Sequence, residues 1–179
     1  MPIKITKPNE RTDRANVDGF ETVIGKKLPD DYREFLFNFN GGRPESNEFS
    51  VPAQKSAAGI NLFYGLLKAK EWGDLLYQRE MLMDRVPKDV LPIGEASCGN
   101  AVCLSLRPDT YGQIFFWDHE LEADEGQEAT FSNLFLISNS FTGFLSDLEK
   151  FDINQVQLKP GQVKSAWIDP EFLKSLKGK

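Results

Sequence analysis

The only histidine of this chain, His119, is the first candidate for chemistry, and it lies between Asp118 and Glu120. An imidazole beside carboxylates is typical of a general base or of a metal ligand. A zinc site needs three or four ligands, and the only two cysteines are Cys98 and Cys103. We therefore interpret His119 as a residue at a strand end, hydrogen-bonded to a neighbour, and we predict no metal site.

A nucleophilic pair of Cys103 and His119 is the second candidate. Cys103 falls inside the apolar run 101–106, where a buried thiol stays protonated and inert. The glycines at 41–42, 94, 99 and 112 form neither a dinucleotide-binding nor a P-loop pattern, so they are interpreted as turn residues. The sequence predicts no catalytic residue and no cofactor.

An acidic segment, residues 118–128, is the strongest charge signal in the chain. It holds six acidic residues and no lysine or arginine: Asp118, Glu120, Glu122, Asp124, Glu125 and Glu128. An EF-hand calcium loop needs glycine at its sixth position, which here is Ala123. Two interpretations stay open, a solvated loop without a partner and a surface that steers a basic partner into contact. Trp117, just before the segment, is expected to be exposed at the sheet edge and to contact that partner.

Composition limits the classes of partner. The 179 residues include 21 Lys and Arg against 27 Asp and Glu, a net charge of −6, which argues against nucleic acid as the main partner. No stretch approaches the roughly 20 apolar residues of a membrane helix, and the first fifteen residues lack the apolar core of a signal peptide. With only two cysteines, a disulfide framework is not expected. The expected location is the cytoplasm.

Local patterns predict the elements that position these residues. Apolar spacing predicts helices over 17–24 and 30–39, ended by Gly25 and by Asn40 with its following glycines. A further helix is predicted over 68–85, with Trp72 in the core rather than on a docking face. A fourth helix follows Ser140, with a face that extends to Phe151.

The remaining segments predict strands and a tail. Residues 48–53 and 60–66 are predicted to be extended, residues 101–106 and 113–117 form a hairpin, and residues 134–137 supply another strand. Pro52 favours an edge position or a bulge. The pattern predicts an α+β domain with a mainly antiparallel, twisted sheet and about four helices. Residues 152–179 are expected to form a tail with a short helix from Asp169, packed on the domain of residues 1–151.

Four segments in order resemble the SUKH superfamily. They are residues 20–42 with Leu28-Pro29-Asp30-Asp31-Tyr32, residues 91–105 with Leu91-Pro92-Ile93-Gly94, the run Gly112 to Glu120, and the helix from Ser140 to Leu148. The resemblance spans about residues 16–151 and implies the same α+β fold. Most of the matched residues are structural, and together they form no catalytic set.

The resemblance implies a binding role. Bacterial members are regarded as immunity proteins that neutralise a toxin from neighbouring or sibling cells, often a nuclease or a deaminase. Fungal relatives act as cell-wall and signalling regulators through partner binding. We expect a basic cognate toxin to dock on Trp117 and the acidic segment. The alternatives are an intracellular regulator in envelope or stress signalling, and a small hydrolase or transferase that uses Asp118 and His119.

Overall fold

The first helix of the chain begins at a residue that can cap a helix, and the first two helices both end at such residues. In the computed structural model, which describes residues 3–68, 71–124 and 126–150, Asp13 accepts a hydrogen bond from the backbone N–H of Asn16 and caps α1 (Arg14–Ile24). Gly25 ends α1 at φ 67°, and Asn40 ends α2 (Asp30–Phe39) at φ 50°. Both end residues have left-handed backbone, so the two predicted helices are confirmed with their predicted ends.

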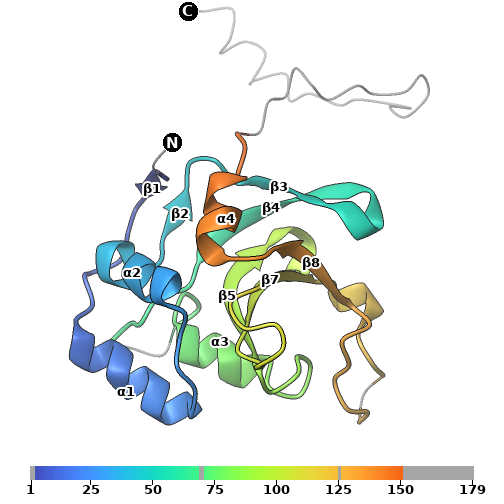
Figure 1. The fold of residues 1–179 in the computed structure, drawn as a ribbon, viewed down its shortest axis with the longest axis horizontal. Helices are drawn as coiled ribbons and strands as arrows, with labels where there is room; N and C mark the ends of the chain where they lie inside the picture. Colours follow the sequence, from blue (N-terminus) through green and yellow to red (C-terminus); the bar gives the residue numbers. More distant parts are fainter. Residues whose placement is uncertain (1–2, 69–70, 125, 151–179) are drawn as a thin grey trace, which may run out of the picture.

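The strands of the described residues form two antiparallel sheets (Figure 1). A small sheet pairs β1 (Ile5–Thr6) with β2 (Arg43–Pro44). The large sheet has six strands in sequence order: β3 (Glu48–Val51), β4 (Ser56–Phe63), β5 (Val90–Ala96), β6 (Ala101–Ser105), β7 (Ile114–Trp117) and β8 (Leu134–Ser138). The remaining α-helices of the described chain are α3 (Leu75–Met81) and α4 (Phe141–Ser146). The predicted α+β class with about four helices is confirmed.

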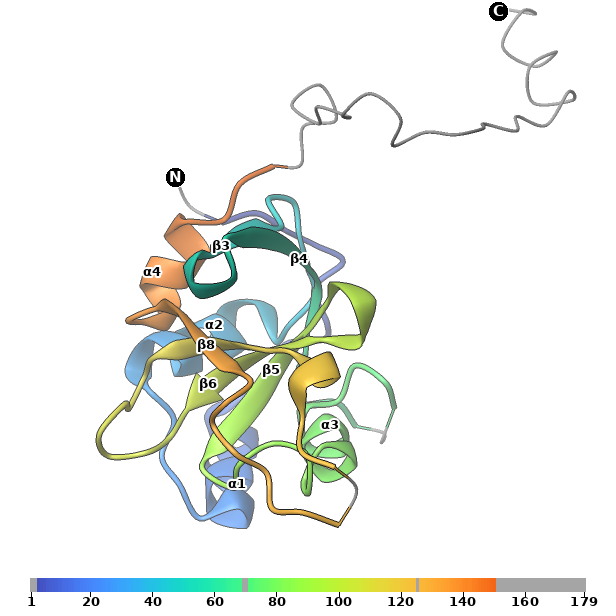
Figure 2. The ribbon, with the colours of Figure 1, turned by 90° about the vertical axis from the view of Figure 1, so that its right-hand side faces the viewer.

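Both faces of the large sheet are covered at its central strand β6. Side chains alternate along β6, so that Val102 and Leu104 point into the main core while Ala101 and Cys103 point into a smaller apolar cluster. All five residues of β6 are buried for this reason, which explains its unbroken apolar sequence. Helices α2 and α4 lie side by side against the main-core face, as Figure 2 shows.

The aromatic residues of the main core come from both ends of the chain. The rings of Tyr32 and Phe141 meet edge to face with centres 4.9 Å apart, and those of Phe35 and Phe63 with centres 5.0 Å apart. The sheet also curls, so that β3 lies against β8 and the Phe49 ring packs on Phe116. On the edge of β3 that is not paired with β4, Glu48 forms an antiparallel bridge with Glu149. Residues near the end of the described chain are thereby joined to the first strand of the large sheet.

Several elements differ from their predicted bounds. The helix predicted over 68–85 is only α3, and Trp72 precedes it with 60% of its surface exposed, so the core assignment of Trp72 is wrong. Strand β5 contains the Leu91–Gly94 motif and was not predicted, because Pro92 and Gly94 disfavour regular strands; here they lie at a bulge. Helix α4 ends at Ser146, before its predicted end.

Other expectations have a mixed outcome. Pro52 begins a 3-10 turn, η1 (Pro52–Gln54), which ends the edge strand β3 as expected for proline. The 101–106 and 113–117 hairpin is confirmed as β6 and β7, and the strand predicted over 134–137 is β8. Phe151 and the tail helix predicted from Asp169 lie outside the described residues.

Candidate functional site

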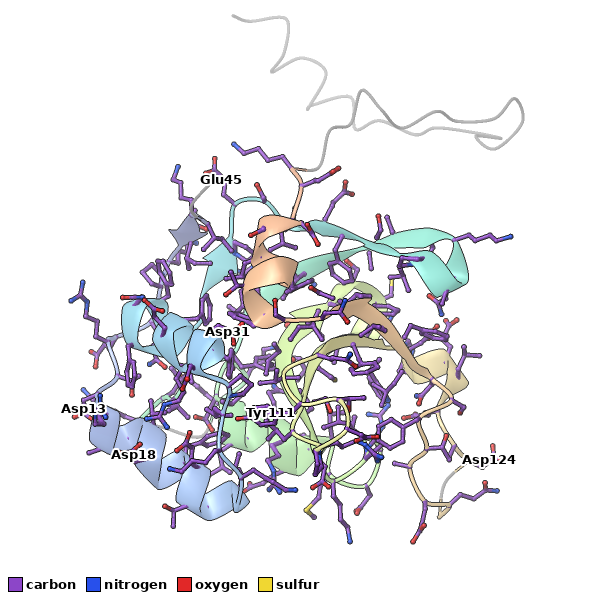
Figure 3. The ribbon with its side chains drawn as sticks, viewed as in Figure 1. Asp13, Asp18, Asp31, Glu45, Tyr111 and Asp124 are labelled. Carbon is purple, nitrogen blue, oxygen red and sulfur yellow. The ribbon has the colours of Figure 1, made fainter. Side chains whose placement is uncertain are left out.

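The acidic segment is the connection between β7 and β8. It begins with η3 (His119–Leu121), directly after the strand, and its outer part carries Asp124 away from the body of the domain (Figure 3). Both ends are fixed by the sheet, because Asp118 and Asn133 exchange hydrogen bonds that include the Asp118 N–H to the Asn133 carbonyl at 3.0 Å. The loop is therefore long but well anchored.

Two of the acidic side chains have partners inside the molecule. The Asp118 carboxylate accepts hydrogen bonds from the Glu120 N–H at 3.1 Å and from Gln54 Nε2 at 2.6 Å, which links the acidic segment to η1. Glu122 accepts two hydrogen bonds from Arg85, at 2.8 and 2.9 Å. Paired carboxylates of this kind stabilise the loop and are less available to a partner.

Three further acidic side chains of the segment are exposed in the part of the chain that the structure describes. Glu120, Asp124 and Glu128 are exposed and form no ion pair with the described residues. Glu125, which was also expected at the docking surface, lies outside the described residues. The structure thus divides the five described acidic residues of the segment into two anchoring members, Asp118 and Glu122, and three exposed ones.

Trp117 is not at an exposed edge. Its side chain is fully buried in the smaller apolar cluster, under the segment 82–90, so the predicted exposure is wrong. The alternation of β7 turns Phe116 into the main core and Trp117 to the opposite face, which Val86 covers. The Arg85 guanidinium lies 5.1 Å from the centre of the indole. Trp117 thus supports the acidic segment from beneath and has no surface to offer a partner.

His119 has the hydrogen-bonded position that the sequence predicted. Its Nδ1 lies 2.7 Å from Asn100 Oδ1, which also accepts the His119 backbone N–H at 3.0 Å. Because the Asn100 amide oxygen can only accept, His119 Nδ1 is the donor in this contact. The imidazole packs over Gly99, where an added Cβ would lie 3.6 Å from the ring.

The other candidate for chemistry, Cys103, is fully buried, and burial raises the pKa of its thiol. A protonated thiol in an apolar cluster has little nucleophilic character. Within residues 3–68, 71–124 and 126–150, no three side chains of His, Cys, Asp or Glu are grouped closely enough to hold a metal ion. The described helices include none with both the length and the apolar character needed to cross a membrane.

A groove that sequence patterns did not indicate lies beside the acidic segment. One wall is residues 83–89, which follow α3, and the other is residues 122–124 and 126–129, with a volume of about 950 Å³ between them. The helix predicted over 68–85 takes in only residues 83–85 of this wall, and sequence patterns do not indicate that residues 83–89 line a groove. Its three consecutive residues Asp84, Arg85 and Val86 combine opposite charges with one buried apolar side chain.

Comparison with known proteins gives two matches. The model of the SMI1 / KNR4 family (SUKH-1) matches residues 12–147. A protein of Bacillus subtilis (strain 168), described as SPbeta prophage-derived uncharacterized protein YokK, is 32% identical over 145 residues, which cover 72% of this chain and 70% of the relative. The family match runs from the residue before the α1 cap through α4, and so includes the acidic segment and both walls of the groove.

Proposed function

Because the chain belongs to the SMI1/KNR4 family (SUKH-1), which includes immunity proteins, we propose that it is a non-enzymatic immunity protein that neutralises a cognate toxin by direct binding. The observation that carries this proposal is the family match over residues 12–147, which takes in all four described α-helices and the whole large sheet. The proposed site of action is the cytoplasm, where an incoming toxin would meet its target.

The charge of the protein supports a basic toxin. A nuclease that binds an anionic substrate carries a basic surface, and a protein that covers that surface is expected to be acidic. The net charge of −6 and the exposed carboxylates of Glu120, Asp124 and Glu128 meet this expectation. Complementary charge would speed the encounter and would reject partners of the wrong sign.

The surroundings of His119 and Cys103 favour binding over catalysis. The His119 Nδ1 and the adjacent Asp118 carboxylate both have hydrogen-bond partners that fix local structure. The Cys103 thiol has no exposure to solvent. A hydrolase or transferase built on Asp118 and His119 would have to release these groups from structural contacts.

The proposal is tested by co-expressing the full chain with the polypeptide encoded immediately beside it, followed by calorimetric titration of the purified pair. We expect that the neighbour alone stops growth, that co-expression restores growth, and that the pair forms a one-to-one complex of nanomolar affinity. A neighbour that is harmless and does not bind would contradict the proposal. Binding without rescue from a toxic neighbour would also contradict it, and would favour a regulatory role.

A matched variant separates binding from catalysis in the same assay. His119→Ala is expected to keep both the affinity and the rescue, since its imidazole contributes one local hydrogen bond to Asn100. Loss of rescue with unchanged affinity would instead support an enzyme.

A further inference from the structure

The groove between residues 83–89 on one side and residues 122–124 and 126–129 on the other has more negative charge than its own ion pairs neutralise. Among its lining residues, Arg85 is paired with Glu122, and Asp89 with Lys26 at 3.1 Å. The lining groups that form no ion pair with the described residues are the carboxylates of Asp84, Asp124 and Glu128 and the ammonium of Lys88. Three carboxylates against one ammonium leave the groove negative after its internal pairs are formed.

The groove also has an exposed apolar side chain. Met83 lines it with 53% of its surface exposed, although methionine is usually buried. Methionine is unbranched and polarisable, and it adapts to partners of different shape at binding surfaces. A carboxylate-lined groove with a methionine in one wall suits an occupant that combines positive charge with an apolar side chain.

The two walls are held together before any partner arrives. Arg85 of one wall donates two hydrogen bonds to Glu122 of the other, and Val86 packs behind it in the smaller apolar cluster. Binding to a preformed groove costs less conformational entropy than binding to a loop that must first become ordered.

We propose that this groove receives a lysine- or arginine-bearing segment of the partner, with an apolar residue of that segment packed on Met83. This inference rests on the proposed function for the identity of the partner as a toxin, and it specifies which part of the surface the toxin contacts. The charges of Asp84, Asp124 and Glu128 select against acidic or nucleic-acid occupants.

The first test uses the full chain and a defined probe, a 14-residue amphipathic peptide of leucine and lysine, with a leucine–glutamate peptide of the same length as its control. In isotope-labelled protein, we expect the lysine peptide to shift the backbone amide signals of Met83, Ala123 and Gly126, and the glutamate peptide to leave them unchanged. The proposal would be overturned if the lysine peptide shifted only amide signals on other surfaces of the protein, or if it did not bind at all.

Two variants with the same net charge distinguish binding in the groove from a general effect of the charge of the protein. The groove variant carries Asp84→Lys, Asp124→Lys and Glu128→Lys, and its control carries Glu34→Lys, Asp147→Lys and Glu149→Lys at exposed positions outside the groove. We expect the groove variant to bind the lysine peptide at least about tenfold more weakly and the control to bind it nearly as wild type, because screening limits the effect of distant charges. Equal weakening by both sets would show that only net charge matters and would overturn the proposal.

The methionine contact has its own matched pair. Met83 lines the groove and Met81 does not, and they are similarly exposed at 53% and 55%. We expect Met83→Ser to weaken peptide binding several-fold and Met81→Ser to have little effect. Equal effects of the two substitutions would contradict the apolar contact.

The same variants distinguish failure of the groove from failure of the function. If the neighbouring toxin binds the groove variant as tightly as wild type and growth is rescued, the groove proposal fails and the immunity function stands. If no toxin is found, the function fails, and the peptide map still decides whether the groove binds basic segments.

Discussion

Arg85 and Glu122 are joined by two hydrogen bonds, from Nε to Oε2 at 2.8 Å and from Nη2 to Oε1 at 2.9 Å. The planar guanidinium matches the carboxylate at two points, a geometry that lysine cannot reproduce. The same guanidinium covers the face of Trp117. One side chain therefore connects the acidic segment to the segment 83–89 and shields the indole beneath them.

Arg85→Ala should lower the free energy of unfolding by about 1 kcal/mol. The substitution removes a half-exposed ion pair and a cation–π contact, and each of these contributes only part of this free energy. It should also shift tryptophan emission to longer wavelength as water reaches Trp117. Urea denaturation followed by fluorescence measures both effects. Arg43→Ala is the control, since that exposed side chain forms no ion pair with the described residues. Identical emission spectra for wild type and Arg85→Ala would contradict this account.

The buried carboxylate of Glu21 predicts a loss of stability in acid. Burial raises its pKa, but hydrogen bonds from Lys27, the Leu28 N–H and Arg33 lower the pKa more, so it lies below the ordinary value. Its contribution to stability is therefore complete above the unfolded-state pKa of about 4.3 and is lost as the pH falls through the lower folded-state pKa.

Glu21→Gln tests this linkage. At pH 7 it should cost about 2 to 3 kcal/mol of unfolding free energy, because it weakens charge-assisted hydrogen bonds at a buried site. The cost should shrink as the pH is lowered below 4, where the wild-type carboxylate takes up a proton. Glu34→Gln, at an exposed position of α2, should have little effect at either pH. A cost of Glu21→Gln that is independent of pH would exclude the carboxylate as the titrating group.

The Tyr32 hydroxyl is a buried polar group that has no hydrogen-bond partner among the described residues. Tyr32→Phe should raise the free energy of unfolding by about 1 kcal/mol, since it removes the cost of burying that hydroxyl while keeping the ring contacts. Tyr111→Phe is the matched control, because its exposed hydroxyl donates to the Lys27 carbonyl at 3.1 Å. Thermal unfolding of both variants decides the point, and a lower melting temperature for Tyr32→Phe would show that the hydroxyl is paired in solution.

Asn40 combines a left-handed backbone with a buried amide that holds the chain at Leu66. Its Oδ1 accepts the Leu66 N–H at 2.7 Å, and its Nδ2 donates to the carbonyls of Leu66 and Glu10. Asn40→Gly keeps the backbone conformation and should still cost about 2 to 3 kcal/mol, at roughly 1 kcal/mol for each lost hydrogen bond. Lys55, with φ 51° and an exposed side chain, is the control. Lys55→Gly should be neutral or stabilising by up to about 1 kcal/mol, because glycine adopts this backbone freely. Chemical denaturation would reject the role of the amide if both glycine variants had the same effect.

The parts of the fold that were predictable are those where local chemistry and packing agree. Helices α1 and α2 have apolar residues at helical spacing and residues that tolerate left-handed backbone at their ends. The β6–β7 hairpin has two apolar runs around turn residues. Strand β5 was not predictable, because Pro92 and Gly94 oppose a strand locally and are accommodated only by a bulge against β6.

The sequence predicted the acidic segment of the candidate site, but it did not predict which of its side chains are exposed and which are paired. All six acidic residues are equivalent in the sequence. The division of the five described members depends on Gln54 and Arg85, which lie 64 and 37 residues from their partners Asp118 and Glu122. The exposure predicted for Trp117 is wrong for a related reason, since the segment 82–90 that covers it is distant from Trp117 in the sequence. Contacts between residues so far apart in the sequence cannot be predicted from the local spacing of residue types.

The contacts that close the fold also govern how the chain reaches it. Asp31 Oδ2 accepts the Thr142 N–H across 111 residues, and the Glu48–Glu149 bridge joins similarly distant segments. Closing loops of this length carries an entropic cost before these contacts form, so folding should reach completion only once α4 is available. During synthesis, the faces of Tyr32 and Phe35 that Phe141 covers remain open until the ribosome has delivered that helix. Assembly of the native structure is therefore expected to be a single, late and cooperative event.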